Sequence, residues 1–187
     1  MRRLALVLLL VVVTACPAFG VRELEGVELP ERIDSDTQQL VINGAGVRSK
    51  WFLDLYVAGL YLEAPLIDAR QVIDADRPSL LRLEIVSGLI SSEKMEKATR
   101  EGFEKAASGG YPASTEQVDA FIEVFREEIK EGDRFDLFYL PGEGVRATKN
   151  GVLRATLSGL PFKQALLAVW LGEEPAQESL RQALLTH

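Results

Sequence analysis

The sequence is poor in the side chains that carry most enzyme chemistry. Its single histidine is the last residue, His187, which excludes serine–histidine triads, histidine zinc sites and most histidine general bases from the body of the chain. Its single cysteine, Cys16, lies near the N-terminus, so the remainder offers no disulfide, thiolate metal site or cysteine nucleophile. Acidic pairs such as Glu127-Glu128 lack further ligands and make poor metal sites. We therefore expect no cofactor.

Basic residues are fewer than acidic ones. The chain has 21 Lys and Arg against 28 Asp and Glu, a formal net charge of −7. Removal of residues 1–20 would bring this charge to about −9. A surface of this charge disfavours nucleic acid and anionic membranes as partners.

Long hydrophobic runs are absent except at residues 4–13, which follow Arg2 and Arg3. A membrane-spanning helix needs roughly twenty apolar residues, about twice the length of this run. We therefore expect residues 1–20 to be a signal peptide and the mature chain to have no transmembrane segment. The expected localisation is outside the cytoplasm, in the periplasm.

Two cleavage sites compete within this segment. Ala18-Phe19-Gly20 has small residues at the positions that a general signal peptidase reads, and cleavage there would release a chain starting near Val21. Val13-Thr14-Ala15-Cys16 instead resembles the lipobox of bacterial lipoproteins, which would give a leader of residues 1–15 and an acylated Cys16 as a membrane anchor. A chance cysteine inside a signal peptide is the third interpretation, and the sequence leaves all three open.

Residues 21–37 are polar and acidic and are expected to be a lead-in, with one edge strand, to a single domain at residues 38–187. Residues 38–63 predict two long antiparallel strands. Residues 40–42 start the first, and residues 51–62, which are rich in β-branched and aromatic side chains, form the second. We expect the turn between them near Arg48-Ser49-Lys50. Apolar residues at both even and odd positions predict that this part of the sheet is covered on both faces.

The pattern further along the chain predicts helices and hairpins. Residues 92–108 have helical spacing before Gly109-Gly110, and a second helix begins at the capping box of residues 114–117 and carries an apolar stripe to Ile129. Asn150-Gly151 is a strong hairpin signal. The other expected elements are a short helix at 68–76, strands at 80–86, 135–140, 145–149 and 152–157, and helices opened by Pro161 and Pro175. This order predicts an α+β fold with an antiparallel sheet.

Gly44-Ala45-Gly46 resembles part of a nucleotide-binding loop, but the third glycine of that motif is missing and a strand follows in place of a helix. Glycines inside a strand more often allow another backbone or a ligand to approach closely. We expect that simpler explanation here.

The stretch Asn43-Gly44-Ala45-Gly46-Val47-Arg48, followed by Tyr56-Val57-Ala58-Gly59-Leu60-Tyr61-Leu62-Glu63, closely resembles the core of the chalcone isomerase-like superfamily, and its exported bacterial branch is the nearest match. Weaker likeness extends over most of residues 38–185. The resemblance implies an open-faced β-sandwich, in which helices pack on one face of a large antiparallel sheet and a ligand cleft lies against it. In this superfamily true chalcone isomerases cyclise chalcones into flavanones, whereas other members lack that activity and bind fatty acids.

Individual positions argue against the isomerase. Arg48 matches the arginine with which isomerases hold an anionic oxygen. The isomerase threonine falls at Tyr56, and the tyrosine and asparagine of the first helix fall near Ser91 and Ala98. Without the hydroxyl and amide donors, an isomerase would lose most of its transition-state stabilisation. The residues Ser91-Ser92 are better explained as a helix N-cap than as a nucleophile.

Arg48 with Tyr56 resembles instead the pair with which fatty-acid-binding relatives hold a carboxylate. A guanidinium offers planar paired donors to a carboxylate, and the phenol adds a third. The acyl chain is expected to lie on apolar residues of the sheet face: Phe52, Ala58, Leu60 and Leu62.

Alternatives at these positions stay open. Asp54 lies on the same predicted face as Tyr56 and nearer to Arg48, so an Arg48–Asp54 ion pair that merely holds the turn is a competing interpretation. Trp51 and Trp170 are expected to be packing residues.

The leading functional hypothesis is a non-catalytic periplasmic binding protein for a fatty acid or a similar amphipathic carboxylate. One alternative is an isomerase or lyase that acts on a phenolic or enone compound through Arg48. Another is a structural or interaction module of the envelope, without ligand and anchored through Cys16.

Overall fold

The computed structural model describes residues 20–34 and 38–186. The expected leader peptide up to Phe19, with Cys16, lies outside the described residues. Within them no helix is long and apolar enough to cross a bilayer.

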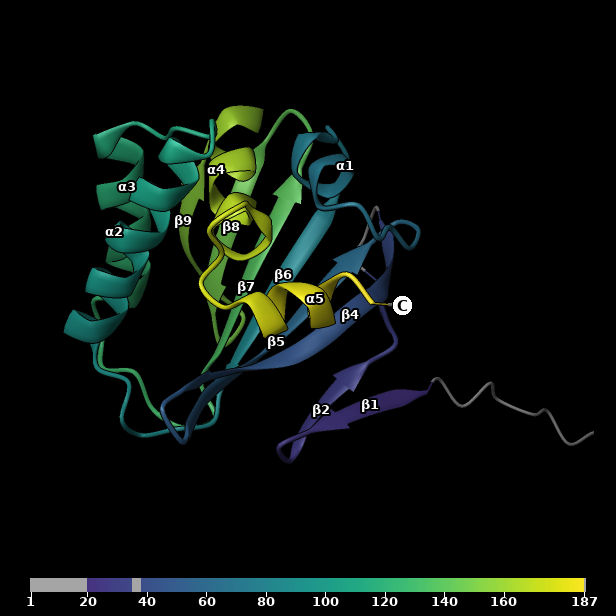
Figure 1. Cartoon of the computed structure of the whole chain (residues 1–187), viewed down its shortest axis with the longest axis vertical. Helices are drawn as coiled ribbons and strands as arrows, with labels where there is room; N and C mark the ends of the chain where they lie inside the picture. Colours follow the sequence, from purple (N-terminus) through teal and green to yellow (C-terminus); the bar gives the residue numbers. More distant parts are fainter. Residues whose placement is uncertain (1–19, 35–37, 187) are drawn as a thin grey trace, which may run out of the picture.

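A seven-stranded antiparallel sheet forms the centre of the fold, with its strands side by side in chain order (Figure 1). The strands are β3 (Arg32–Asp34), β4 (Gln39–Lys50), β5 (Leu53–Leu62), β6 (Ser79–Ile85), β7 (Arg134–Leu140), β8 (Gly144–Lys149) and β9 (Val152–Leu157). Because each strand pairs with its neighbours in the sequence, the sheet is a meander, and helices are inserted where the chain leaves it after β5, β6 and β9.

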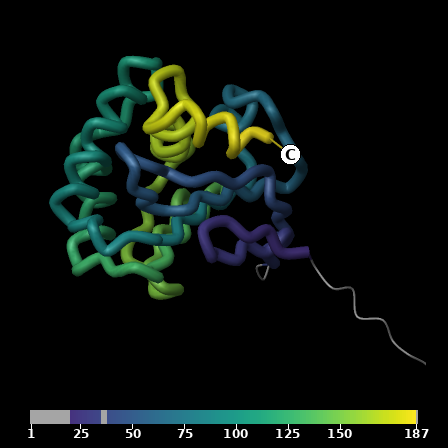
Figure 2. Tube along the Cα trace, turned by 60° about the horizontal axis from the view of Figure 1, so that its bottom comes forward, coloured from purple at the N-terminus to yellow at the C-terminus, as the bar shows by residue number. Residues whose placement is uncertain are grey.

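The helices cover one face of this sheet and a small hairpin covers part of the other. In Figure 2 the strands lie between the yellow C-terminal helices and the purple hairpin of β1 (Val21–Leu24) and β2 (Val27–Pro30). The helices are α1 (Ala69–Asp74), α2 (Ser92–Ser108), α3 (Thr115–Ile122) with a 3-10 turn at Glu123–Phe125, α4 (Leu160–Leu171) and α5 (Glu178–Leu184). The segment that we expected to be a lead-in with one edge strand thus carries β1, β2 and β3.

Strand alternation separates the two cores. On β6, Leu81, Leu83 and Ile85 lie in the larger core under the helices, whereas Leu80 packs with Tyr61 and Leu29 in the smaller core under the hairpin. The sheet is therefore covered on both faces here, which explains the apolar residues at both even and odd positions of the first strands. The α+β fold with helices packed on one face of an antiparallel sheet is confirmed.

Three element boundaries differ from the sequence prediction. The last helix, expected to be opened by Pro175, begins at Glu178. β4 runs to Lys50, so the β4–β5 turn is formed by Trp51 and Phe52 rather than by the residues near Ser49. The helix expected to reach Ile129 ends with the 3-10 turn at Phe125. Beyond it, the side chains of Ser92 and Lys149 bond the carbonyl oxygens of residues 126–128, which takes the place of further helical hydrogen bonds.

The glycines of β4 explain how α5 reaches the sheet. A Cβ on Gly44 would lie 2.3 Å from the carbonyl oxygen of Ala183, and one on Gly46 would lie 2.7 Å from the Ala183 Cβ. The buried Asn43 side chain donates to the carbonyl oxygen of Leu184 at 2.8 Å and thereby fixes the end of α5. The close approach of another backbone, expected from the sequence, is what these glycines permit.

A buried lysine joins α4 to α1. Lys163 is 1% exposed, and its ammonium group donates hydrogen bonds of 2.7–2.9 Å to the carbonyl oxygens of Val72, Ile73 and Ala75. These carbonyls belong to the C-terminal end of α1, where helical partners are missing. Burial lowers the pKa of Lys163 to about 8, although the carboxylates of Asp74 and Asp76 oppose this shift.

We predict that Gly44→Ala lowers the free energy of unfolding by about 2–3 kcal/mol, because the new methyl group meets backbone atoms that cannot move independently. Gly88→Ala is the matched control, since a Cβ at this position would meet no atom within 4 Å; its effect should stay within about 1 kcal/mol. Urea denaturation measures both. Equal stability of the two variants would contradict the proposed tight contact of α5 with β4.

We predict that Lys163→Met lowers the free energy of unfolding by about 2–4 kcal/mol, because three carbonyl oxygens, two of them buried, lose their donor. Lys97→Met, on a side chain that is 80% exposed, should change stability by less than about 0.5 kcal/mol. Denaturation curves of the two variants at neutral pH provide the comparison, and a stable Lys163→Met protein would show that the cap is dispensable.

Candidate functional site

Arg48 and Tyr56 lie directly opposite each other on β4 and β5. Opposite residues of an antiparallel pair share a face of the sheet. Tyr56 is 7% exposed and belongs to the core under the helices, so both side chains point to the helical side. Ala58 and Leu60 follow Tyr56 on this face and are fully buried.

Arg48 makes its contacts with neutral oxygens. Its Nη1 donates to the backbone oxygen of Ser49 and to the Oε1 atom of Gln177, both at 2.8 Å. The same Gln177 oxygen accepts the backbone N–H of Ser49 at 3.0 Å. Within residues 20–34 and 38–186, no carboxylate forms an ion pair with Arg48. The guanidinium charge is therefore solvated by amide and carbonyl oxygens but not neutralised by them.

The expected alternative, an ion pair between Arg48 and Asp54, is not formed. The ladder shifts register between Arg48 and Ser49, so that Asp54 pairs with Ser49 and not with Arg48. The Asp54 carboxylate accepts the Ser49 hydroxyl at 2.7 Å. The bulge thus turns the nearest acid of the hairpin towards a neighbouring serine.

The Tyr56 hydroxyl keeps its proton and can donate it. Burial raises the pKa of Tyr56, and the hydrogen bond from Trp170 and the nearby charge of Arg48 oppose this shift only in part. The indole N–H of Trp170 donates to the phenol oxygen at 3.0 Å. Since an indole nitrogen only donates, the phenol proton is not used in that bond. In the described part of the chain no acceptor for it is found.

Two kinds of donor therefore converge here, and none of the carboxylates that the structure describes pairs with Arg48. The guanidinium of Arg48 retains N–H groups beyond those bound to Ser49 and Gln177, and Tyr56 retains its O–H. This set is suited to a carboxylate, which accepts several hydrogen bonds and gains from the adjacent positive charge. The described residues contain no cluster of His, Cys, Asp or Glu that could hold a metal ion.

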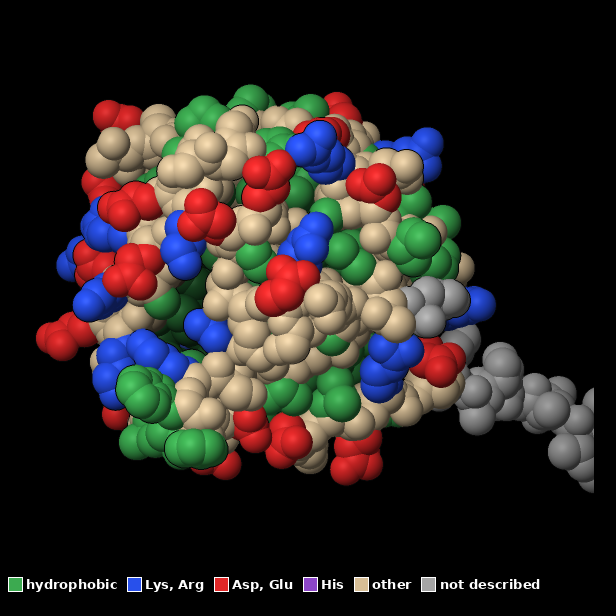
Figure 3. Space-filling model, viewed as in Figure 1, with side chains coloured by type: hydrophobic (Ala, Val, Ile, Leu, Met, Phe, Trp, Pro, Cys, Tyr) green, Lys and Arg blue, Asp and Glu red, His purple; other side chains and the backbone are tan. Residues whose placement is uncertain are grey.

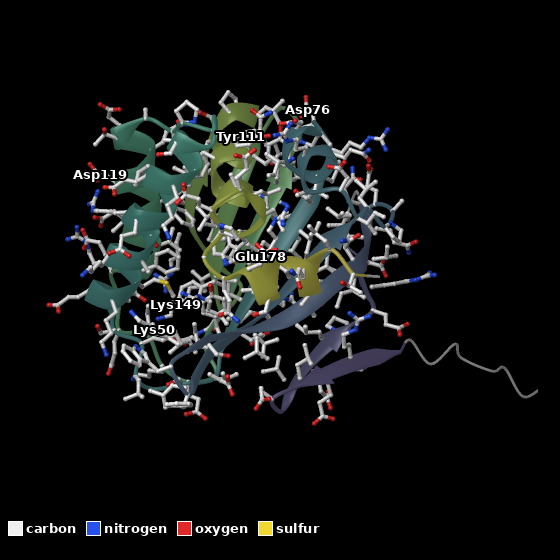
Figure 4. The ribbon with its side chains drawn as sticks, in the orientation of Figure 1. Lys50, Asp76, Tyr111, Asp119, Lys149 and Glu178 are labelled. Carbon is white, nitrogen blue, oxygen red and sulfur yellow. The ribbon has the colours of Figure 1, made fainter. Side chains whose placement is uncertain are left out.

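A hollow opens on the face of the molecule that carries the helices. Figure 3 shows it between α2 and the α4–α5 segment, with hydrophobic side chains in its depth and Lys or Arg side chains at its lower edge. In the matching stick view Glu178 marks the start of α5 on one side of it, and Lys50 marks the end of the β4–β5 hairpin below it (Figure 4).

Two other surface crevices are less suited to an amphipathic ligand. One of about 460 Å³ lies between α2 and α3, where Arg100 already pairs with Glu96 and Asp119. Another of about 240 Å³ lies on the opposite face of the sheet, beside the ion pair of Arg82 and Asp136. Neither is lined by Arg48 or Tyr56.

The structure places the sequence-selected residues in two groups. Arg48, Tyr56, Ala58 and Leu60 share the helical side of the sheet, whereas Phe52 is 99% exposed in the β4–β5 turn. The expectation that Phe52 lies on the same sheet face is wrong, because the strand continues to Lys50 and the turn includes Phe52 itself. Trp51, expected to be a packing residue, is 86% exposed in the same turn.

Two residues of the site were missed in the sequence. Trp170 was expected only to pack, yet its indole bonds Tyr56. Gln177 precedes α5 and carried no signal, because its contact with Arg48 spans 129 residues of the chain. Of the positions matched to isomerase residues on α2, Ser91 accepts the backbone N–H of Lys94 as a helix cap and Ala98 is exposed.

Comparisons with known proteins agree with this architecture. A model of the chalcone isomerase-like family matches residues 21–186. The crystal structure of the Arabidopsis thaliana fatty-acid binding protein AtFAP1 superposes with a TM-score of 0.71 at 21% sequence identity, covering 89% of this chain and 95% of the plant protein. No curated protein sequence matches the chain significantly. The chain belongs to the chalcone isomerase-like family.

Proposed function

We propose that this protein binds a fatty acid or a similar amphipathic carboxylate, without catalysing a reaction on it, and that it does so outside the cytoplasm, in the periplasm. The carboxylate would accept hydrogen bonds from Arg48 and Tyr56, and the acyl chain would lie between the sheet and the helices. The observation that carries this proposal is a guanidinium that has no carboxylate partner among residues 20–34 and 38–186, beside a buried phenol whose proton has no acceptor among those same residues.

Electrostatics favours an external anion at this position. A charge that leaves water loses solvation, and hydrogen bonds to neutral oxygens recover only a part of that loss. The neighbours of the Arg48 guanidinium are the carbonyl of Ser49, the amide of Gln177 and the phenol of Tyr56. A ligand carboxylate would supply the missing countercharge at this partly buried position.

The surroundings of the pair suit an acyl chain. Ala58, Leu60 and Leu83 are almost fully buried in the core beneath the helices. A hollow with hydrophobic side chains in its depth opens on the same side of the sheet (Figure 3). An apolar space with a few polar groups at one end is the usual form of a site for an amphipathic small molecule. The similarity to a fatty-acid binding protein supports the same ligand class.

We predict that Arg48→Ala weakens the binding of oleate roughly a hundredfold, because a charge-assisted pair of hydrogen bonds is lost. Titration calorimetry measures the affinity, and native mass spectrometry of gently purified protein shows whether a lipid is retained. Arg70→Ala is the matched control, since Arg70 is an exposed arginine paired with Glu173 on the surface. Unchanged oleate affinity in a folded Arg48→Ala protein would overturn the proposed site.

We predict that Gln177→Glu abolishes oleate binding while the fold is retained. The new carboxylate has the shape of the amide, stays 2.8 Å from Arg48 Nη1 and neutralises the charge that the ligand needs. Gln71→Glu, on the exposed face of α1, adds the same charge at a distance and should bind oleate as the wild type does.

Calorimetry again measures the affinity, and thermal unfolding verifies that Gln177→Glu is folded. If both glutamate variants bound oleate equally well, the charge of Arg48 would not be what holds the ligand. This comparison separates loss of charge from loss of structure, which Arg48→Ala alone does not.

A further inference from the structure

The tip of the β4–β5 hairpin exposes apolar side chains that the proposed site does not use. Trp51 is 86% exposed, Phe52 99% and Leu53 49%. Leu89, in the loop between β6 and α2, is 52% exposed. Figure 3 shows hydrophobic side chains gathered at the lower left, where Figure 1 places the end of this hairpin, with Lys or Arg side chains directly above them.

Strand pairing brings these two loops to the same end of the sheet. β5 begins at Leu53, next to the tip, and β6 ends at Ile85, opposite Tyr56. The chain beyond β6 stays beside β5, because the backbone N–H of Val86 donates to the carbonyl oxygen of Leu55 at 3.0 Å. The hairpin tip and the Leu89 loop therefore form one exposed apolar end, which we call the apolar tip (residues 51–53 and Leu89).

The backbone at the tip is held in an unfavourable conformation. Trp51 has a φ of +63°, in the left-handed region. Lys50 pairs with Leu53, so Trp51 is the first residue of a two-residue hairpin loop, a position where glycine is the usual residue when φ is positive. A bulky side chain at positive φ is a genuine outlier, and such strain is found mainly where function requires it. Nothing in the described fold uses the Trp51 ring.

Charges of both signs flank the tip, and two of them are lysines. Lys50 is exposed at the end of β4, and in the described part of the chain it forms no ion pair. Lys94 donates to the carbonyl oxygen of Leu89 at 2.9 Å, which holds a second ammonium group beside the tip. Of the nearby acids, Asp54 is bonded to Ser49, and Glu93 lies in the first turn of α2.

This combination fits a phospholipid surface better than a protein surface. Trp is enriched at membrane interfaces because its ring is apolar while its N–H can stay in the wet headgroup layer, and flanking lysines lie at the level of the lipid phosphates. A stable protein interface covers roughly 800 Å² on each partner, more than a protruding tip of four side chains offers. The net charge of −7 opposes a strongly anionic membrane, so a zwitterionic surface is favoured.

We propose that the apolar tip docks the protein on a zwitterionic phospholipid surface by inserting Trp51, Phe52 and Leu53 into the interface. The docking itself does not depend on ligand binding. One consequence rests on the proposed function: Arg48 lies on the same hairpin, three residues before Trp51, so docking brings the carboxylate site close to the lipid from which an amphipathic acid would leave.

Phosphatidylcholine vesicles provide the direct test, with co-sedimentation of the wild-type chain and tryptophan emission as measurements. Of the two tryptophans in the sequence, Trp170 is buried and bonded, so a shift to shorter wavelength and quenching by brominated lipid would report Trp51. We expect both effects. A wild-type protein that neither sediments with the vesicles nor changes its emission would overturn the proposal.

Two variants test the tip and a third is the control. Trp51→Gly relieves the positive φ, so its thermal stability should equal or exceed that of the wild type while its vesicle partitioning falls about tenfold or more. Phe52→Ser should weaken partitioning to a similar extent and retain the Trp51 reporter. Ile67→Ser removes a 77% exposed apolar side chain beyond the other end of β5 and should partition as the wild type does.

Other results of these experiments would distinguish lipid docking from self-association and from failure of the carboxylate site. Equal partitioning of all three variants would overturn docking through the tip. Self-association in gel filtration that Phe52→Ser abolishes, without vesicle binding, would show that a second copy of the chain covers the tip and would overturn the lipid proposal. Arg48→Ala should lose oleate and still bind vesicles, whereas Trp51→Gly should bind oleate in solution and lose vesicles, so the failure of docking is distinguishable from the failure of the proposed function.

Discussion

Contact between α5 and β4 positions the neutral partner of Arg48 at the candidate site. The helix can lie on the strand only because Gly44 and Gly46 present no side chain to it, and Asn43 secures its end through the Leu184 carbonyl. This contact brings Gln177, the residue before α5, next to Arg48 on the same strand. The small residues of β4 thus allow Gln177, 129 positions further along the chain, to hold the Arg48 guanidinium beside Tyr56.

Because Gln177, the partner of Arg48, is a neutral amide, the site can still accept an anion. A glutamate at the position of Gln177 would form a stable ion pair with Arg48, and the hairpin would then carry a structural bridge. The amide fixes the geometry through the same oxygen but leaves the charge uncompensated. The bulge after Arg48 also leaves the guanidinium without a countercharge from Asp54, because it pairs Asp54 with Ser49. Orientation by neutral groups is how a protein can keep a cation positioned and still available to a ligand.

Local patterns predicted much of the fold, and long-range contacts account for most of what they missed. Helix α2 begins and ends where its spacing and glycines indicate, and the β8–β9 turn lies at Asn150-Gly151. The β4–β5 turn was misplaced because Trp51 adopts a positive φ without being glycine, which local propensity argues against. The burial of Lys163 and the contact of Gln177 with Arg48 depend on partners about ninety or more residues away, and no local pattern encodes such pairs.

The β4–β5 hairpin connects the two proposals physically. Its turn carries the exposed rings, its paired strands carry Arg48 and Tyr56, and a few residues of paired strand, with one register shift between Arg48 and Ser49, join the two regions. Because this connection is short, a surface that holds the turn also keeps the guanidinium close to that surface. An amphipathic acid in a lipid layer presents its carboxylate at the headgroup level, where the adjacent site could accept it without the acyl chain first crossing bulk water. Strain at Trp51 is then understandable as the consequence of placing an aromatic ring where the fold alone would favour glycine.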